Sequence, residues 1–159
     1  MKYLGIILII IAVMLFFFSL YKKREERLLL EREISRLLLH IKREISCFSR
    51  PLADAISSFE SETLSKMGFF EISGKSGSIR ERVYLFFKSS SVSEDALSII
   101  EGYFMSECGY LESENARISE TSERFCKYLT DREARCEREK KLFSLLSFAV
   151  SFGVVIIVL

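Results

Sequence analysis

The stretch YLGIILIIIAVMLFFFSLY, residues 3–21, decides how this chain is built, because it carries no charge and is followed at once by Lys22-Lys23-Arg24. A second uncharged apolar stretch, Leu142–Leu159, stands at the other end of the sequence. As α-helices rising about 1.5 Å per residue, both reach roughly 27–28 Å, close to the hydrocarbon thickness of a bilayer. The pattern predicts transmembrane helices at residues 3–21 and 142–159, with a charged domain at residues 22–141.

Each apolar stretch has an alternative interpretation. The first could be a cleaved signal peptide, but it is long and passes from Phe16-Phe17-Phe18-Ser19-Leu20-Tyr21 straight into basic residues, without a small-residue cleavage site. The second could be a helix buried in a soluble core, although such helices seldom contain this many uncharged residues at a chain end. A membrane anchor at each end is the favoured interpretation.

Charge predicts on which side of the membrane the domain lies. Beyond the apolar stretches the only charged residue is Lys2, whereas basic residues flank both stretches on the side of the domain. These are Lys22, Lys23, Arg24, Arg27, Arg132, Arg135, Arg138, Lys140 and Lys141. The positive-inside rule therefore places the domain in the cytoplasm and both termini on the far side. The same charged runs suit solvated helix surface, anchoring at anionic lipid, or docking of a partner.

The composition of the domain argues against several classes of protein. Without Lys2 the chain has 22 basic and 22 acidic residues, whereas a nucleic-acid-binding protein usually has a basic excess. The four cysteines form no C-x-x-C pair and are expected to be free thiols in a reducing compartment. His40 is the only histidine, so neither a histidine-rich metal site nor a Ser-His-Asp triad is indicated, and no cofactor is expected.

One short segment resembles part of a phosphate-binding loop. Gly74-Lys75-Ser76 has the Gly-Lys-Ser ending, but the first glycine that such a loop requires would fall on Phe69, and no strand precedes it. Nucleotide binding is therefore not expected. A membrane enzyme that uses a nucleophile such as Cys47 or Ser76 remains a second hypothesis.

Helices are expected through nearly all of the domain, because it has one proline and little of the Val/Thr alternation typical of strands. A first helix should leave the membrane and end at Ser49-Arg50-Pro51. Its predicted buried stripe is Ile34, Leu37, Leu38, Ile41, Ile45 and Phe48. Pro51 suits the first turn of a second helix, which Met67-Gly68 should end. Its predicted buried face is Leu52, Ala55, Ile56 and Phe59.

Three further helices are expected after the loop Gly74–Ser78. The first spans Ile79–Lys88, with its bulk from Val83, Leu85, Phe86 and Phe87. Ser91-Val92-Ser93-Glu94 has capping-box spacing for the next, which runs through Leu97, Ile100 and Phe104 and is closed by Cys108-Gly109. The last begins near Glu112 and runs unbroken into the membrane, and its stripe suits packing against the long first helix. That stripe is Ile118, Ser122, Phe125, Leu129 and Cys136. The predicted fold is all-α, an antiparallel cytoplasmic bundle flanked by N- and C-terminal transmembrane helices.

Several segments, in this order, resemble the stage III sporulation protein AB family of endospore-forming bacteria. They are Glu31-Arg32-Glu33-Ile34, then Ile41-Lys42-Arg43-Glu44-Ile45, then Pro51-Leu52-Ala53-Asp54-Ala55, where Asp54 replaces the usual glutamate. A later family segment reads Leu-Gly-x-x-Asp and is followed by a glutamine, and it corresponds here to Cys108–Glu112. Glu112 stands in place of the aspartate and Ala116 near the expected glutamine, so both positions depart from the family pattern. The resemblance suggests a partner surface made by Arg32, Glu44, Pro51, Leu52, Asp54, Ala55, Gly109 and Glu112.

The resemblance also implies a function. The family is similar to the inner-membrane platform proteins of type II secretion and type IV pilus machines, and it belongs to a channel apparatus between mother cell and forespore. It implies a non-catalytic platform in the mother-cell membrane that docks a secretion-type ATPase. Other channel subunits and membrane lipid are the further partners, with no nucleic acid and no small-molecule substrate. A membrane-anchored helical scaffold unrelated to sporulation is the alternative.

Overall fold

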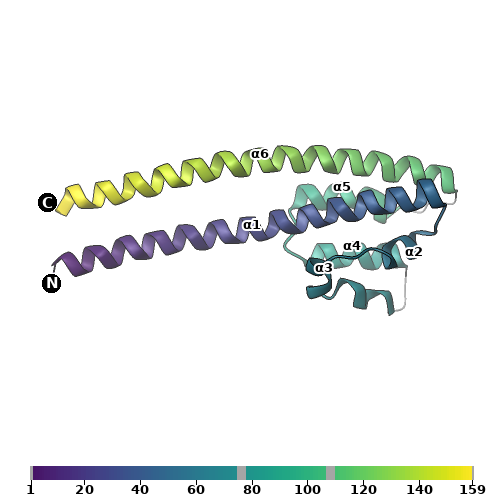
Figure 1. Ribbon diagram of the computed structural model, residues 1–159, viewed down its shortest axis with the longest axis horizontal. Coiled ribbons are helices and arrows are strands. Elements are labelled where there is room, and N and C mark those ends of the chain that lie inside the picture. Colours follow the sequence, from purple (N-terminus) through teal and green to yellow (C-terminus); the bar gives the residue numbers. More distant parts are fainter. Residues whose placement is uncertain (1, 75–77, 107–109, 159) are drawn as a thin grey trace. The chain divides into compact units, whose positions relative to one another are not determined.

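Helices are the regular elements in residues 2–74, 78–106 and 110–158, which are the residues that the computed structural model describes (Figure 1). In these ranges there is no strand, so the predicted all-α fold is confirmed. The elements are α1 (Lys2–Phe48), α2 (Leu52–Ser57), α3 (Glu62–Lys66), the 3₁₀ helix η1 (Phe69–Gly74), α4 (Ile79–Ser89), α5 (Glu94–Phe104) and α6 (Leu111–Val158).

The chain divides into two units, each of which contains part of α1 and part of α6. The end unit comprises Met1–Glu26 and Asp131–Leu159, and the central unit comprises Arg27–Thr130. Among the residues that the structure describes, no helix is long and apolar enough to cross a membrane. The transmembrane helices expected at residues 3–21 and 142–159 stay a prediction.

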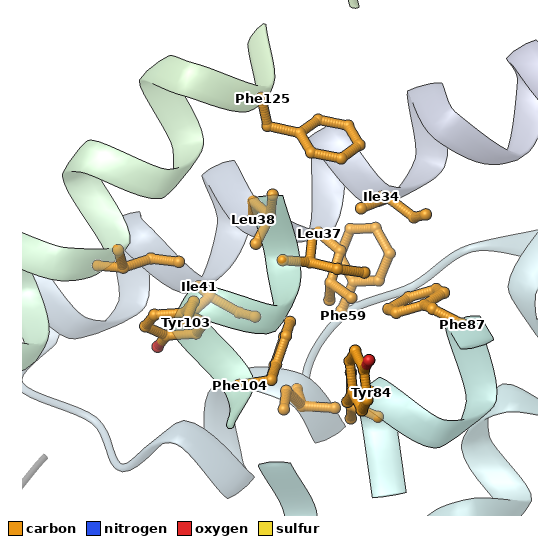
Figure 2. Packing of buried hydrophobic residues seen from close by; sticks show 14 of the residues in the cluster. Ile34, Leu37, Leu38, Ile41, Phe59, Tyr84, Phe87, Tyr103, Phe104 and Phe125 are labelled. Atoms are coloured by element: carbon orange, nitrogen blue, oxygen red, sulfur yellow. The ribbon is translucent and has the colours of Figure 1, made fainter. Parts of the chain in front are cut away.

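The central unit is built around one apolar core. The spacing of three and four residues places Ile34, Leu37, Leu38, Ile41 and Ile45 on one face of α1, and all five are buried as predicted. Figure 2 shows side chains of α1 pointing into the same cluster as aromatic rings from the other elements. Those rings are Phe59, Tyr84, Phe87, Tyr103, Phe104 and Phe125. Every helix of the central unit thus contributes to a single core.

Phe48 was predicted to complete the stripe of α1, and this is wrong, because its side chain is 59% exposed. The helix ends at Phe48, and the chain then turns away through Ser49 in a left-handed conformation. The ring of Phe48 lies beside the Arg50 guanidinium, 5.6 Å from ring centroid to Cζ, instead of entering the core. The periodicity of a helix predicts burial only as far as the core extends.

The single helix predicted from Pro51 to Met67 is two helices. The hydroxyls of Ser57 and Ser58 donate to the carbonyl oxygens of Asp54 and Ala55 at the end of α2. The Ser61 hydroxyl then accepts the N–H of Leu64 at 3.2 Å and caps α3. The predicted buried residues Leu52, Ala55, Ile56 and Phe59 are confirmed, as is the end of the segment at Met67-Gly68.

Two details of α4 and α5 differ from the prediction. In α4, Leu85 is 51% exposed, while Tyr84 is buried together with Val83 and Phe87. In α5, the capping residue is Ser93, whose hydroxyl accepts the N–H of Ala96 at 3.3 Å, and it is not Ser91. The helix ends at Phe104, and the predicted closing pair Cys108-Gly109 lies outside the described residues, as does Lys75–Gly77 of the predicted loop.

In the central unit α1 and α6 run antiparallel. Glu31 of α1 accepts a hydrogen bond of 3.1 Å from the hydroxyl of Tyr128, and Lys42 lies 3.5 Å from Glu123. Residue numbers therefore rise along α1 as they fall along α6. The Tyr128 hydroxyl is also 2.6 Å from Oγ of Ser93, the cap of α5. The predicted stripe of α6 is buried at Ile118, Ser122 and Phe125 and half-buried at Leu129 and Cys136.

Candidate interaction surface at the α1–α2 connection

The connection between α1 and α2, here called the elbow (Phe48–Pro51), is a tight turn with a strained residue. Ser49 has φ 51°, in the left-handed region that glycine normally occupies. Its N–H donates to the carbonyl of Ile45 at 3.1 Å, and the N–H of Arg50 donates to that of Glu44 at 3.2 Å. These bonds satisfy two carbonyl groups at the end of α1. Pro51 then precedes α2 in an extended conformation.

A buried carboxylate lies beneath the elbow. The Glu44 side chain is 5% exposed and accepts hydrogen bonds from two arginines. Nη1 of Arg50 lies 2.9 Å from Oε2, and Nη2 of Arg43 lies 3.2 Å from Oε1. Charge-assisted bonds of this kind offset the cost of burying a carboxylate. Since both guanidinium groups are more than half exposed, they also present positive charge to solvent.

His40 connects α1 to the residues that follow α2. Its Nε2 lies 3.0 Å from the Ser58 hydroxyl, and its ring centroid is 5.3 Å from that of Phe59. Nη2 of Arg43 lies 3.5 Å from the other ring nitrogen. These contacts give His40 a structural role.

Glu33 makes a similar connection to α3. Its carboxylate accepts a hydrogen bond of 2.7 Å from the Ser61 hydroxyl and one of 2.8 Å from Arg36. Glu33, His40 and Glu44 thus form a polar seam along α1, defined by these three residues, which fixes the segment from the elbow to α3. The hydroxyl partners of His40 and Glu33 lie 18 and 28 residues away in sequence, so no local motif could have identified these two contacts.

The structure brings together five of the eight residues that the family resemblance suggested. Pro51, Leu52, Asp54 and Ala55 lie at the end of the elbow and in the first turn of α2, and Glu44 lies on α1 about one turn before the elbow, where it binds Arg50. Leu52 and Ala55 are part of the core, so they position this surface and do not form it, whereas Pro51 and Asp54 are exposed.

The other three residues lie elsewhere. Arg32 is exposed on α1, about four turns before the elbow. Glu112 is exposed in the first turn of α6. Gly109 lies outside the described residues. The resemblance therefore points to one compact surface and to two separate positions.

Exposed apolar side chains surround the elbow's end of the central unit. Figure 1 shows the end of α1 and the start of α6 at the same end of this unit. The last part of α5 is held against α6, because Arg117 of α6 donates a hydrogen bond of 2.6 Å to the carbonyl of Gly102 in α5. The exposed apolar residues at these helix ends are Phe48, Met105, Tyr110 and Leu111.

An open pocket lies beside the seam but offers little chemistry. It has a volume of about 430 Å³ and is lined by Ser57, Phe59, Glu60, Ser61, Glu62, Ser65 and Phe70. The hydrogen bond that Lys66 donates is the main cause that lowers the pKa of Glu62, and the positive charge of Lys66 lowers it further. The carboxylate of Glu62 is thereby held ionised in an exposed pair with Lys66 of 2.7 Å.

The nucleophiles considered from the sequence are not joined to a base in the described part of the chain. Cys47 is an exposed free thiol 3.8 Å from the Ser46 hydroxyl, while His40 contacts Ser58. Ser76 lies outside the described residues. Within those residues, no group of three or more His, Cys, Asp or Glu side chains could hold a metal ion. The geometry supports a surface for binding a protein more than a reaction centre.

The sequence profile of the family described as Stage III sporulation protein AB matches residues 2–159, nearly the whole chain. No protein with a curated description and no solved structure shows a significant match.

Proposed function

Because this chain belongs to the stage III sporulation protein AB family and is therefore a sporulation-related protein, we propose that it is a non-catalytic membrane platform. It is a component of a channel between mother cell and forespore, and it docks a secretion-type ATPase. The apolar ends at residues 3–21 and 142–159 lie in the mother-cell membrane, with the domain in the cytoplasm and both termini on the far side. Other channel subunits and membrane lipid are its further partners.

The observation that carries the docking proposal is the surface at the elbow. The exposed ring of Phe48 lies beside the Arg50 guanidinium, and Arg43 presents a second exposed cation nearby through their shared carboxylate, Glu44. Arginine and aromatic side chains are the residue types most enriched at binding hot spots. A partner surface with carboxylates around an apolar pocket would complement this arrangement, and we assign that surface to the ATPase.

Two further observations support a role without catalysis. The only histidine is engaged with Ser58 and Arg43, and it is therefore not positioned to activate the exposed thiol of Cys47. The residues that the resemblance singled out at the elbow include two that belong to the core, Leu52 and Ala55. Such residues shape a surface and do not carry chemistry.

The experiment is affinity capture of the tagged full-length protein from sporulating membranes in mild detergent, with the secretion-type ATPase detected by mass spectrometry. Phe48→Ser should reduce recovery of the ATPase at least ten-fold, the loss expected for a hot-spot residue worth about 1.4 kcal/mol or more. Leu85→Ser is the matched control, since Leu85 is similarly exposed but lies on α4. It should leave recovery unchanged.

Three results would count against the proposal. Recovery of the wild-type protein without the ATPase, together with normal spore formation after deletion, would exclude a platform role. Equal loss of the ATPase in the Phe48 and Leu85 variants would place the binding surface elsewhere than the elbow. Extraction of the wild-type protein by alkaline carbonate without detergent would contradict the proposed membrane location.

A further inference from the structure

Positive charge is concentrated where the two apolar ends begin. Residues 22–24 and 138–141 contain six basic side chains and one acidic one, Glu139, for a net charge of +5. Residues 25–137 contain 16 basic and 21 acidic side chains, for a net charge of −5. The near neutrality of the chain therefore conceals a separation of charge. We call residues 22–24 and 138–141 the basic collar.

The structure brings the two halves of the collar to one level of the end unit. Arg24 of α1 forms an ion pair with Glu139 of α6, and its guanidinium carbon lies 5.3 Å from the ring centroid of Phe143. One turn away, Nζ of Lys140 lies 5.7 Å from the ring centroid of Tyr21. Two segments separated by more than 110 residues in sequence thus form one basic surface.

The charges of the collar are available to a ligand. The one carboxylate in the collar pairs with Arg24, which leaves the other five basic residues in excess. Lys22, Lys23, Lys140 and Lys141 are all exposed. Their long side chains can extend along a helix surface while the ammonium groups reach polar surroundings.

Aromatic rings mark the side of the collar that faces the apolar ends. Tyr21 is the last residue of the first uncharged stretch, and Phe143 is the second residue of the other. Tyrosine beside lysine is typical of the level at which a helix passes from hydrocarbon to headgroups. The contact between Lys140 and Tyr21 places a cation and an amphipathic ring at that level from opposite helices.

We propose that the basic collar binds the phosphate groups of anionic phospholipids in the cytoplasmic leaflet. This inference rests on the proposed function, because it requires the apolar ends to lie in a bilayer. Each Lys or Arg near an anionic membrane surface strengthens association about five-fold, the equivalent of about 1 kcal/mol. The net charge of −5 on residues 25–137 gives the rest of the chain no such attraction, so the selectivity should reside in the collar alone.

The test uses the full-length protein reconstituted in phosphatidylcholine bilayers, with trace spin-labelled phosphatidylglycerol or phosphatidylcholine as the probe. Electron paramagnetic resonance gives the relative association constant of each labelled lipid with the protein. We expect about a five-fold preference for phosphatidylglycerol in the wild type at low salt, which should weaken in 1 M salt, where the Debye length is about 3 Å.

Two quadruple variants make the test specific. Changing Lys22, Lys23, Lys140 and Lys141 to Gln should bring the preference close to one. Changing Lys42, Lys66, Lys88 and Lys127 to Gln removes the same charge from the central unit and should leave the preference intact. Retention in the bilayer after an alkaline carbonate wash is measured for every sample.

The outcomes separate this inference from the proposed function. If the protein stays in the bilayer but binds both lipids equally, or if both variants keep the preference, lipid binding by the collar is refuted. The proposed membrane platform is not affected by either result. Failure of the wild type to stay in any bilayer overturns the membrane location and, with it, the collar.

Discussion

The same two helices pair in different ways in the two units of the molecule. In the central unit, α1 contributes Ile34 and Leu38 and α6 contributes Ile118 and Phe125 to one buried core. In the end unit, the contacts described between α1 and α6 are an exposed ion pair and cation–ring contacts at the basic collar. Among the residues whose side chains the structure describes, the buried core therefore lies in the central unit.

The largest expected effect comes from charging the core of the central unit. Leu38→Asp or Phe125→Asp should unfold it, because an unpaired buried charge costs several kcal/mol, a large part of the stability of a small domain. Leu39→Asp is the matched control, since Leu39 is 47% exposed whereas its neighbour Leu38 is 1% exposed. Circular dichroism and limited proteolysis measure the change. Unchanged helicity and protease resistance in both core variants would show that these stripes do not form the core.

A smaller effect is expected at two left-handed residues within the central unit. Ser49→Gly should stabilise the unit by about 0.5–1 kcal/mol, because glycine relieves the strain at φ 51°.

The opposite change, Gly68→Ala, should destabilise the unit by about 1 kcal/mol, because alanine is strained at the φ of 76° that Gly68 adopts. The space around Gly68 would accept a Cβ, whose nearest neighbour would be a Glu71 side-chain oxygen at 3.7 Å, so the conformation alone causes the loss. Urea unfolding midpoints measure both, and shifts of the same sign would contradict the prediction.

A third test uses pH to ionise a buried tyrosine of the core. Burial is the main cause that raises the pKa of Tyr84 above its usual value, and a hydrogen bond to Glu101 and the charge of Glu101 raise it further. A tyrosine whose pKa is higher in the folded state contributes stability that is fully present below about pH 10, its unfolded pKa, and lost as the pH rises through the folded pKa. The urea midpoint of the wild type should fall more steeply above pH 10 than that of Tyr84→Phe. Parallel profiles for the two proteins would refute this account.

The smallest effect is expected in the end unit. The side chains of Arg24 and Glu139 are 45% and 44% exposed, and an exposed ion pair contributes about 0.2–1 kcal/mol at most. Arg24→Gln or Glu139→Gln should therefore shift the thermal midpoint of the detergent-solubilised protein very little, and less still in 0.5 M salt. A loss as large as that from Leu38→Asp would reverse the comparison between the units.

Much of the fold could be predicted from the sequence, because the spacing of apolar residues directly encodes which face of a helix is buried. This holds for Ile34, Leu37 and Ile41 in α1 and for Ile118 and Phe125 in α6. The prediction was wrong where periodicity continued but the core did not. Phe48 keeps the period of α1 yet is exposed.

Breaks between helices were harder to predict, because serine hydroxyls decide them through single hydrogen bonds. Ser61 caps α3 and Ser93 caps α5, but serine is common in these segments and spacing alone favoured Ser91. Only the position of the backbone shows which hydroxyl meets an N–H group.

The candidate surface was predictable in part. The family resemblance located the elbow through Pro51, Leu52 and Asp54, but it could not separate exposed residues from buried ones, since a motif gives residue types in order and not their burial. The links from His40 to Ser58 and from Glu33 to Ser61 depend on how α2 and α3 lie against α1. The residue types alone do not predict such contacts.

The antiparallel course of α1 and α6 has a consequence for biosynthesis. Leu38 leaves the ribosome 87 residues before Phe125, which shares its core. A nascent chain that ends before α6 lacks Ile118 and Phe125 and therefore leaves part of the apolar core exposed to chaperones and proteases. The core of the central unit can therefore be completed only when the last third of the chain, which contains α6, has been synthesised. This order of synthesis opposes early, stepwise folding of the unit.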